Sequence, residues 1–343
     1  MHVLQRVLAS RSCKEAIVEL TAGTDFPGTW TAYDDSWDLE HWKHQFRLVM
    51  HRATPSRLEF DMIGVSATVA NTLRRILIAE VPTMAFEEVY VRTNTGIMTD
   101  EILCHRLGLI PIRADPDKFE ERLAGETPTD GNTIVFDLDV TCSVNPSVPA
   151  TAPLSERHLN RIVTTEHLQW VPQGDQPDLF AMDPIRPVSK DIVITKLNPG
   201  ESISLQLHAK KGTGRDHAKF SPVGTASYRI LPEIHLLRDI TGDAADRFAA
   251  CFPAGVIAVE RDAATGKRKA VVKDARKDTV SREVLRHQEF QDAVTLSRKR
   301  DHFIFQIETV GQVEAQLVLT SALKVLRAKA EALKACLNAL NVD

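Results

Sequence analysis

Hydrophobic and polar residues alternate in a short stretch near residue 60 of the chain. Leu58, Phe60 and Met62 are separated by acidic residues, and a period of two is typical of a strand with one buried face. A similar run at 46–52 precedes it, and the turn-like residues 53–56 separate the two. The pattern predicts two short strands around a turn.

The pattern changes to a helical period after these strands. Leu73, Ile76 and Leu77 fall on one helix face, Ser66 can cap the first turn, and Pro82 is a residue that stops a helix. We therefore predict a helix that Ser66 caps and that runs through Glu80.

The pattern of apolar and polar residues is different in the middle of the chain. A strand at 83–93 and a helix at 100–107 lead into residues 114–228, where short apolar runs are separated by Pro, Gly and Asp. Such spacing is typical of a mostly β segment. Further on, 255–272 is typical of a hairpin, and 281–300 predicts a charged helix.

The chain closes with a strand at 302–311 and a long apolar helix. Leucines recur in that helix at steps of three and four, which is typical of a helix that packs along another helix. Because strands and helices at both ends flank the β-rich middle, we expect a discontinuous domain. The candidate dimerisation residues are Leu319, Leu323, Leu326, Leu333, Leu337 and Leu340.

Composition narrows the class of protein. The 343 residues are 43% hydrophobic, which favours two or three domains, and the net charge of -4 argues against a surface that grips nucleic acid everywhere. The five scattered cysteines fit a reducing compartment. The N-terminal residues lack the pattern of a signal peptide, and no apolar run reaches membrane-spanning length. We expect a soluble intracellular protein.

Residue patterns for catalysis and metal binding are weak. Residues 64–68 lie at a strand-to-helix turn, where a serine hydrolase exposes its nucleophile, but the second glycine of that motif is missing. Helix capping is the favoured role of Ser66, and a hydrolase that uses Ser66 is kept as an alternative. Asp137 and Asp139 share one strand face, which fits a solvated surface better than a metal site. Cys142 has no neighbouring cysteine, although structural zinc needs four Cys or His ligands.

Two adjacent arginines stand in the apolar run of the first long helix. Arg74 and Arg75 lie between Leu73 and Ile76. Ile78 continues the apolar character on the arginine side, and a helix that is apolar nearly all round is a buried helix. The arginines therefore favour an interface with a partner that offers carboxylates or carbonyls to their planar groups, over a plain surface pair.

Three long blocks carry a family resemblance. Residues 61–112, DMIGVSATVANTLRRILIAEVPTMAFEEVYVRTNTGIMTDEILCHRLGLIPI, resemble the alpha motif of cellular RNA polymerase assembly subunits. Together with DHAKFSPVGTASYRILPEI at 216–234 and RDHFIFQIETVG at 300–311, they resemble the large alpha-like subunit shared by eukaryotic RNA polymerases I and III. The resemblance covers residue 33 to the end.

The resemblance implies an α+β fold and a division into domains. A discontinuous dimerisation domain would comprise 44–82 plus 302–343, after an N-terminal arm at 1–43. A β-rich insert domain would take 83–234, and 235–301 would be a degenerate ferredoxin-like insert.

The resemblance also implies partners. The last helix would pair with the small alpha-like subunit. Asn71, Arg74 and Arg75 would contact the second-largest and largest subunits and the small zinc-bearing shared subunits. Contact with DNA or RNA would be indirect, and no membrane contact is expected.

The implied function is that of a non-catalytic assembly subunit of RNA polymerases I and III in the nucleus, including the nucleolus, for transcription of ribosomal, transfer and 5S RNA. No cofactor is expected, because Cys142 alone remains where some relatives bind zinc, and Cys251 alone cannot hold an iron–sulfur cluster. A second alternative is a zinc-free variant of the RNA polymerase II counterpart.

Overall fold

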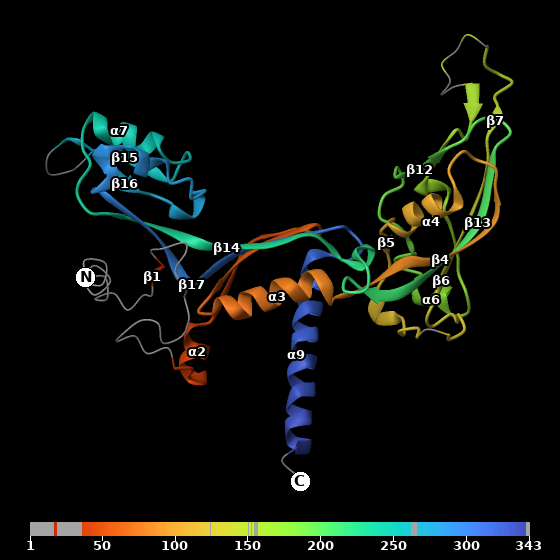
Figure 1. Cartoon of the computed structure of the whole chain (residues 1–343), viewed down its shortest axis with the longest axis horizontal. Coiled ribbons are helices and arrows are strands. Elements are labelled where there is room, and N and C mark those ends of the chain that lie inside the picture. The colour runs from red at the N-terminus through yellow and green to blue at the C-terminus, as the bar shows by residue number, and fades with distance from the viewer. Residues whose placement is uncertain are drawn as a thin grey trace. The chain divides into compact units, whose positions relative to one another are not determined.

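The computed structural model describes residues 17–18, 36–123, 125–149, 151, 153, 157–261 and 266–340 (Figure 1). Two compact units make up the chain, and each is built from separate stretches of sequence. The first comprises Met1–His51, Glu59–Asn71 and Ser227–Phe305; the second comprises Arg52–Leu58, Thr72–Ala226 and Gln306–Asp343. Most of the arm predicted at 1–43 lies outside the described residues.

A five-stranded sheet contains the two strands predicted near residue 60. Its path runs β1-β17-β3-β2, and β14 pairs with β17 away from that path. Leu58, Phe60 and Met62 are buried along β3, as their alternation predicts. The Phe60 ring stacks on Phe305 with 5.1 Å between centroids. The strands are β1 (Ile17–Val18), β2 (Arg47–Ala53), β3 (Arg57–Ile63), β14 (Val223–Leu236) and β17 (Val294–Thr309), and the short helix α2 (Leu39–Gln45) precedes β2.

A buried carboxylate on β3 joins several segments of the first unit. Asp61 accepts a hydrogen bond from Arg276, and its Oδ2 lies 2.9 Å from His302 Nε2 and 3.1 Å from His51 Nε2. Burial raises the pKa of Asp61, but the hydrogen bonds from Arg276 and His302 outweigh burial and hold the pKa below its usual value. Each neighbour thus compensates for the loss of hydration of a buried charge.

A small body with its own core lies between β14 and β17 in the sequence. The hairpin predicted at 255–272 is confirmed as β15 (Ile257–Arg261) paired antiparallel with β16 (Arg268–Val272). Its core contains Phe248, Val284 and Phe290, whose rings and side chains are buried. The remaining elements are α7 (Asp243–Ala250), η5 (Ala275–Lys277), η6 (Glu283–Arg286) and α8 (Gln288–Gln291).

The charged helix predicted over 281–300 is wrong. Two single turns, η6 and α8, form there, and β17 begins already at Val294. Arg298 and Lys299 pair with β1, so the charged end of the segment is strand. Sheet pairing and burial of Val284, Phe290 and Val294 in one core override the helical propensity of the charged residues.

An antiparallel four-stranded sheet is the centre of the second unit, in the order β10-β6-β13-β4. The longest ladder joins β13 to β4, from Ile203↔Asn94 to Thr213↔Pro82, with two register shifts. Phe86, Phe136 and Leu207 are fully buried in the core of this sheet. The β-rich texture predicted for the middle of the chain is therefore confirmed. The strands are β4 (Pro82–Asn94), β6 (Ile134–Thr141), β10 (Gln169–Val171) and β13 (Ser202–Thr213).

Shorter elements accompany this sheet. The helix predicted at 100–107 is confirmed as α4 (Asp100–Gly108), with Leu103 and Leu107 buried. Three two-stranded ladders join β5 (Ile112–Arg113) to β11 (Arg186–Pro187), β9 (Ile162–Thr164) to β12 (Val193–Lys196), and β7 (Ser143–Val144) to β8 (His158–Leu159). The remaining turns are η2 (Pro116–Lys118), η3 (Thr165–His167), α6 (Gln176–Leu179) and η4 (Ala218–Phe220).

Both long helices predicted from their apolar period are confirmed as α3 (Ala67–Ala79) and α9 (Ala315–Leu340). Ser66 stands at the start of α3, where its Oγ lies 3.5 Å from Val69 N. The other end of α3 meets the loop after β13, where Arg215 N donates to Ala79 O at 2.8 Å. A Cβ at Gly214 would lie far inside contact distance of the Ile78 carbonyl oxygen, so only glycine fits there.

Candidate functional site

The α9 helix exposes a row of leucines to solvent. Leu323, Leu333, Leu337 and Leu340 are between 46% and 73% exposed, and Leu326 is half-buried. From Arg327 to the end of the helix every residue is exposed. We call Leu323, Leu326, Leu333, Leu337 and Leu340 the leucine stripe. An apolar surface of this kind on a long helix marks an interaction site.

The start of α9 belongs to the chain's own core. Leu319 is only 6% exposed, and Ala315, Val318 and Ala322 are buried beside it in the sequence. Of the six leucines that the sequence predicts for dimerisation, Leu319 therefore lies in the interior, whereas the others lie on the surface or at its margin. The N-terminal turns of the helix are thus fixed by the core, and its C-terminal turns are exposed to solvent.

Two ion pairs hold α9 within the second unit. Lys329 Nζ lies 2.8 Å from a carboxylate oxygen of Glu80, directly after α3, and Lys324 Nζ lies 3.1 Å from Asp117 Oδ2. Exposed pairs of this kind contribute about 0–1 kcal/mol each, so they orient the helix more than they stabilise it. The Lys329 pair places the end of α3 next to α9 (Figure 1).

The arginine pair lies on the outer side of α3. Arg75 is exposed and Arg74 is half-buried, whereas Leu73, Ile76 and Leu77 on either side of the pair are fully buried. Asn71, one turn earlier, is also half-buried.

The expectation of a helix buried all round is met on one face only. Ile78 and Ala79, on the arginine side, remain half-buried. This partly open side could admit a partner that reaches the guanidinium groups.

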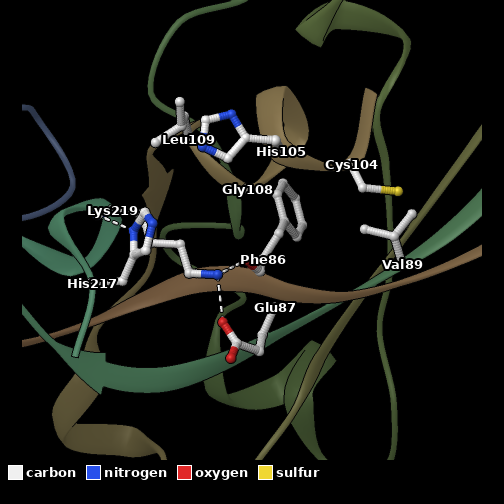
Figure 2. A pocket seen from close by; sticks show the side chains of 9 residues that line it. All are labelled: Phe86, Glu87, Val89, Cys104, His105, Gly108, Leu109, His217 and Lys219. Atoms are coloured by element: carbon white, nitrogen blue, oxygen red, sulfur yellow. Dashed lines mark hydrogen bonds and ion pairs between the residues drawn. The ribbon is translucent and has the colours of Figure 1, made fainter. Parts of the chain in front are cut away.

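A pocket of about 310 Å³ is lined by three segments that are separate in the sequence, β4, α4 and the η4 turn (Figure 2). The Lys219 ammonium donates to Phe86 O at 2.7 Å and pairs with Glu87, and Lys210 Nζ lies 3.1 Å from the same carboxylate. Burial raises the pKa of Glu87, but hydrogen bonds from Lys219 and Lys210 outweigh it and lower the pKa. The other lining residues are Val89, Cys104, His105, Gly108, Leu109 and His217.

The chemistry of this pocket fits a structural role. Burial raises the pKa of the Cys104 thiol, which keeps it protonated and a poor nucleophile near neutral pH. His217 Nδ1 accepts from Lys219 N at 3.1 Å and so shapes the turn that carries Lys219. No local pattern in the sequence predicts this pocket, because its walls come from three separate segments. The sequence feature that could have indicated the pocket is the family resemblance, because two of the lining segments, DEILCHRLGLIPI and DHAKF, belong to the blocks that carry it.

The residues that the sequence offers as candidates for catalysis or metal binding do not lie together in one site. Ser66 is exposed at the start of α3 in a capping position, and Asp137 accepts a hydrogen bond from Gln206 at 3.1 Å. Burial raises the pKa of the Cys142 thiol. Among the described residues, no group of three or more His, Cys, Asp or Glu side chains is arranged to hold a metal ion. Within the same part of the chain, no helix is both long and apolar enough to cross a membrane.

Comparison with protein families gives a match that spans most of the chain. The RNA polymerase Rpb3/Rpb11 dimerisation domain matches residues 59–330. This range contains α3, the four-stranded sheet, strands β14 and β17 of the five-stranded sheet, and α9 as far as Ala330.

Individual proteins are similar over almost the whole length. The DNA-directed RNA polymerases I and III subunit RPAC1 of Mus musculus is 48% identical over 322 residues, which cover 93% of this chain and 92% of the mouse protein. The subunit of the same name from Saccharomyces cerevisiae is 44% identical, with 92% and 95% covered. The DNA-directed RNA polymerases II, IV and V subunit 3 of Arabidopsis thaliana is 28% identical, with 80% and 86% covered.

Proposed function

The chain belongs to the RNA polymerase Rpb3/Rpb11 dimerisation-domain family, and from this membership we propose that it is a non-catalytic assembly subunit of RNA polymerases I and III. The observation that carries the proposal is the 44–48% identity, over more than nine-tenths of the chain, to subunits named for these two polymerases. The lower identity of 28% to a subunit of polymerases II, IV and V disfavours the polymerase II alternative. A hydrolase that uses Ser66 is likewise disfavoured.

We propose that the leucine stripe binds the small alpha-like subunit. Burying a fully exposed leucine side chain contributes about 1.5–3 kcal/mol. The stripe leucines are partly covered already, so each contributes less, and together they form the apolar seam of a helix–helix interface. The N-terminal turns of α9 are fixed by the chain's own core, which lowers the entropy lost when the C-terminal turns bind. Leu319 supports the interface from the interior, by fixing the helix, and does not itself contact the partner.

We propose that Asn71, Arg74 and Arg75 dock the second-largest and largest subunits and the small zinc-bearing shared subunits. Arg75 is exposed and Arg74 half-buried, and a planar guanidinium binds carboxylates and carbonyls in a fixed geometry. The buried face formed by Leu73, Ile76 and Leu77 makes α3 a rigid support for these side chains.

The proposed mechanism of assembly is mass action. Binding of the small alpha-like subunit stabilises the folded state of this chain. The heterodimer then presents α3 to the large subunits, so formation of the heterodimer favours their capture. The site of action is the nucleus, where RNA polymerases I and III work, and we place part of the protein in the nucleolus. The products would be ribosomal, transfer and 5S RNA.

The finer division of the chain is also a proposal. We assign 44–82 plus 302–343 to the dimerisation domain, 83–234 to a β-rich insert and 235–301 to a degenerate ferredoxin-like insert, after an arm at 1–43. The hairpin β15–β16 and the separate core around Phe248 support an independent second insert.

Charge substitutions on α9 test the proposal. In cells that co-express both alpha-like subunits, Leu326→Asp with Leu333→Asp should lose the small subunit, with Kd raised roughly 100-fold or more. Ala328→Asp with Ala335→Asp is the matched control, because both alanines are exposed on α9 about 200° away from the stripe. Equal retention of the small subunit by both double variants would refute the role of the stripe.

A further inference from the structure

The charged side chains that border the leucine stripe all carry a positive charge. The stripe leucines and Ala330 recur at alternating steps of three and four, which is the heptad spacing of a coiled-coil seam. Arg327 and Lys334 each directly follow a stripe leucine and form one flank of the seam, and Lys329 directly precedes Ala330 on the other flank. Cys336 takes the remaining flanking position in these turns. We call Arg327, Lys329 and Lys334 the basic flanks.

The one acidic residue of α9 does not border the seam. Glu331 lies about 140° around the helix from the stripe, and its Oε1 is 2.8 Å from Arg327 Nε. Lys324, the fourth basic residue of α9, lies about 160° from the stripe and pairs with Asp117. The helix therefore has a purely basic margin beside the seam and mixed charges on its far side.

The basic flanks are open to a partner. Lys334 is exposed and has no ion-pair partner in the part of the chain that the structure describes. The side chains of Arg327 and Lys329 are 81% and 56% exposed. Their pairs with Glu331 and Glu80 are weak because water screens them, so carboxylates of another molecule can replace these partners.

A second copy of this chain is a poor match for the same surface. In a coiled coil, the residues that flank the seam of one helix meet the flanking residues of the other helix. Two copies would place basic flanks against basic flanks whether the helices run parallel or antiparallel, and like charges at such positions oppose pairing. The leucines alone do not discriminate, because one apolar seam fits another. The flanking charges therefore decide which helix binds.

We propose that the small alpha-like subunit presents Asp or Glu side chains on both sides of its own seam, opposite Arg327, Lys329 and Lys334. This charge match selects the small subunit over a second copy of this chain. The leucine stripe supplies most of the affinity, whereas the basic flanks set the choice of partner and the rate of association. The inference rests on the proposed function, because it takes the occupant of the stripe from there.

Zero-length carbodiimide cross-linking of the purified heterodimer tests the contact directly. This reagent joins a lysine only to a carboxylate that touches it. We expect Lys334 to link to an Asp or Glu of the small subunit. Lys324 is the matched control on the far side of the same helix, and it should link to Asp117 of its own chain, 3.1 Å away. A Lys324–Asp117 link without any link from Lys334 to the small subunit would overturn the proposal.

A pair of charge variants tests the energetic consequence. Arg327→Gln with Lys334→Gln removes two positive charges beside the seam. Ala328→Glu with Ala335→Glu changes the net charge by the same amount on the opposite side of α9. At about 0.1 M salt the first variant should raise the Kd for the small subunit roughly fivefold, and the second less than about twofold. Equal Kd values for the two variants would contradict the role of the flanks.

Salt and self-association give a second measurement. At about 1 M salt, where the screening length is about 3 Å, the difference between the two variants should vanish. In sedimentation experiments at low salt the unchanged chain should not self-associate through the stripe, and Arg327→Gln with Lys334→Gln should self-associate more than the unchanged chain. A self-dimer of the unchanged chain that is as tight as the heterodimer would overturn the proposal.

The outcomes separate two failures. A chain that does not bind the small alpha-like subunit at all contradicts the proposed function. A chain that binds it with a Kd that neither the flanking charges nor salt affects contradicts only the charge match.

Discussion

At the scale of single residues, Asp61 shows how a charge can be fixed inside the first unit. Three side chains from β2, β17 and η5 meet its carboxylate, and together they tie the small body between β14 and β17 to the sheet. The alternation around residue 60 predicts that Asp61 faces away from Phe60 and Met62. It does not predict the partners, because Arg276 and His302 are more than 200 residues away.

Replacing Asp61 by Asn should destabilise the chain in a pH-dependent way. Loss of the carboxylate leaves Arg276 with a weaker partner, at a cost of about 2–4 kcal/mol in the free energy of unfolding near neutral pH. The pKa of Asp61 is lower in the folded chain than the ordinary value of 3.8. Its contribution is therefore complete above that value and is lost as the pH falls through the folded pKa.

Urea unfolding of both proteins between pH 7 and pH 3 measures this difference, which should shrink at the acid end. Glu59→Gln is the control, because Glu59 is more exposed and lies 3.9 Å from the same arginine, and it should cost under about 1 kcal/mol. A difference between Asp61→Asn and the unchanged protein that is constant across the range would contradict the assignment.

Gly214 gives a second prediction at this scale. A methyl group there would press on the carbonyl at the end of α3, so Gly214→Ala should lower the free energy of unfolding by about 1–3 kcal/mol. Gly224→Ala is a suitable comparison, because the nearest atom to a Cβ at that position is 4.0 Å away. Thermal melting of both variants decides the matter: equal melting temperatures would mean that the loop moves aside freely.

At the scale of elements, periodicity predicts α3, α9, β3 and the β15–β16 hairpin, because each has a strong local pattern. It fails at 281–300, where the charged residues predict a helix. Two single turns and the start of β17 form there, and β17 pairs with β1. Periodicity also overstates the burial of α3, since Ile78 is only half-buried. The pocket around Lys219 depends on segments far apart in the sequence, so no local pattern predicts it.

The arginine pair on α3 gives a prediction for this scale. Arg74→Ala with Arg75→Ala should leave the heterodimer intact, because the leucine stripe lies on another helix, and should weaken capture of the large subunits roughly tenfold or more. Arg74→Lys with Arg75→Lys keeps the charge and loses the planar group, so it should restore capture only in part. Pull-down with a tagged small subunit, followed by quantification of each chain, measures both. Loss of the heterodimer itself would contradict this division of roles.

At the scale of the whole molecule, each of the two units is built from three stretches that are not contiguous in the sequence. Strands from both ends of the sequence lie in one five-stranded sheet, and the segment between them forms a second sheet and a separate small core. The sequence predicts this discontinuity, since strand and helix patterns at the two ends flank a β-rich middle. The partners themselves were implied by the three blocks of resemblance and not by any periodicity.

The central claim is that this chain assembles RNA polymerases I and III. Native mass spectrometry of complexes recovered with an affinity-tagged copy, from the cells that express it, tests this most directly. We predict a heterodimer with a small alpha-like chain together with complexes that contain the large subunits of both polymerases. Recovery of only a monomer or a self-dimer would contradict the account.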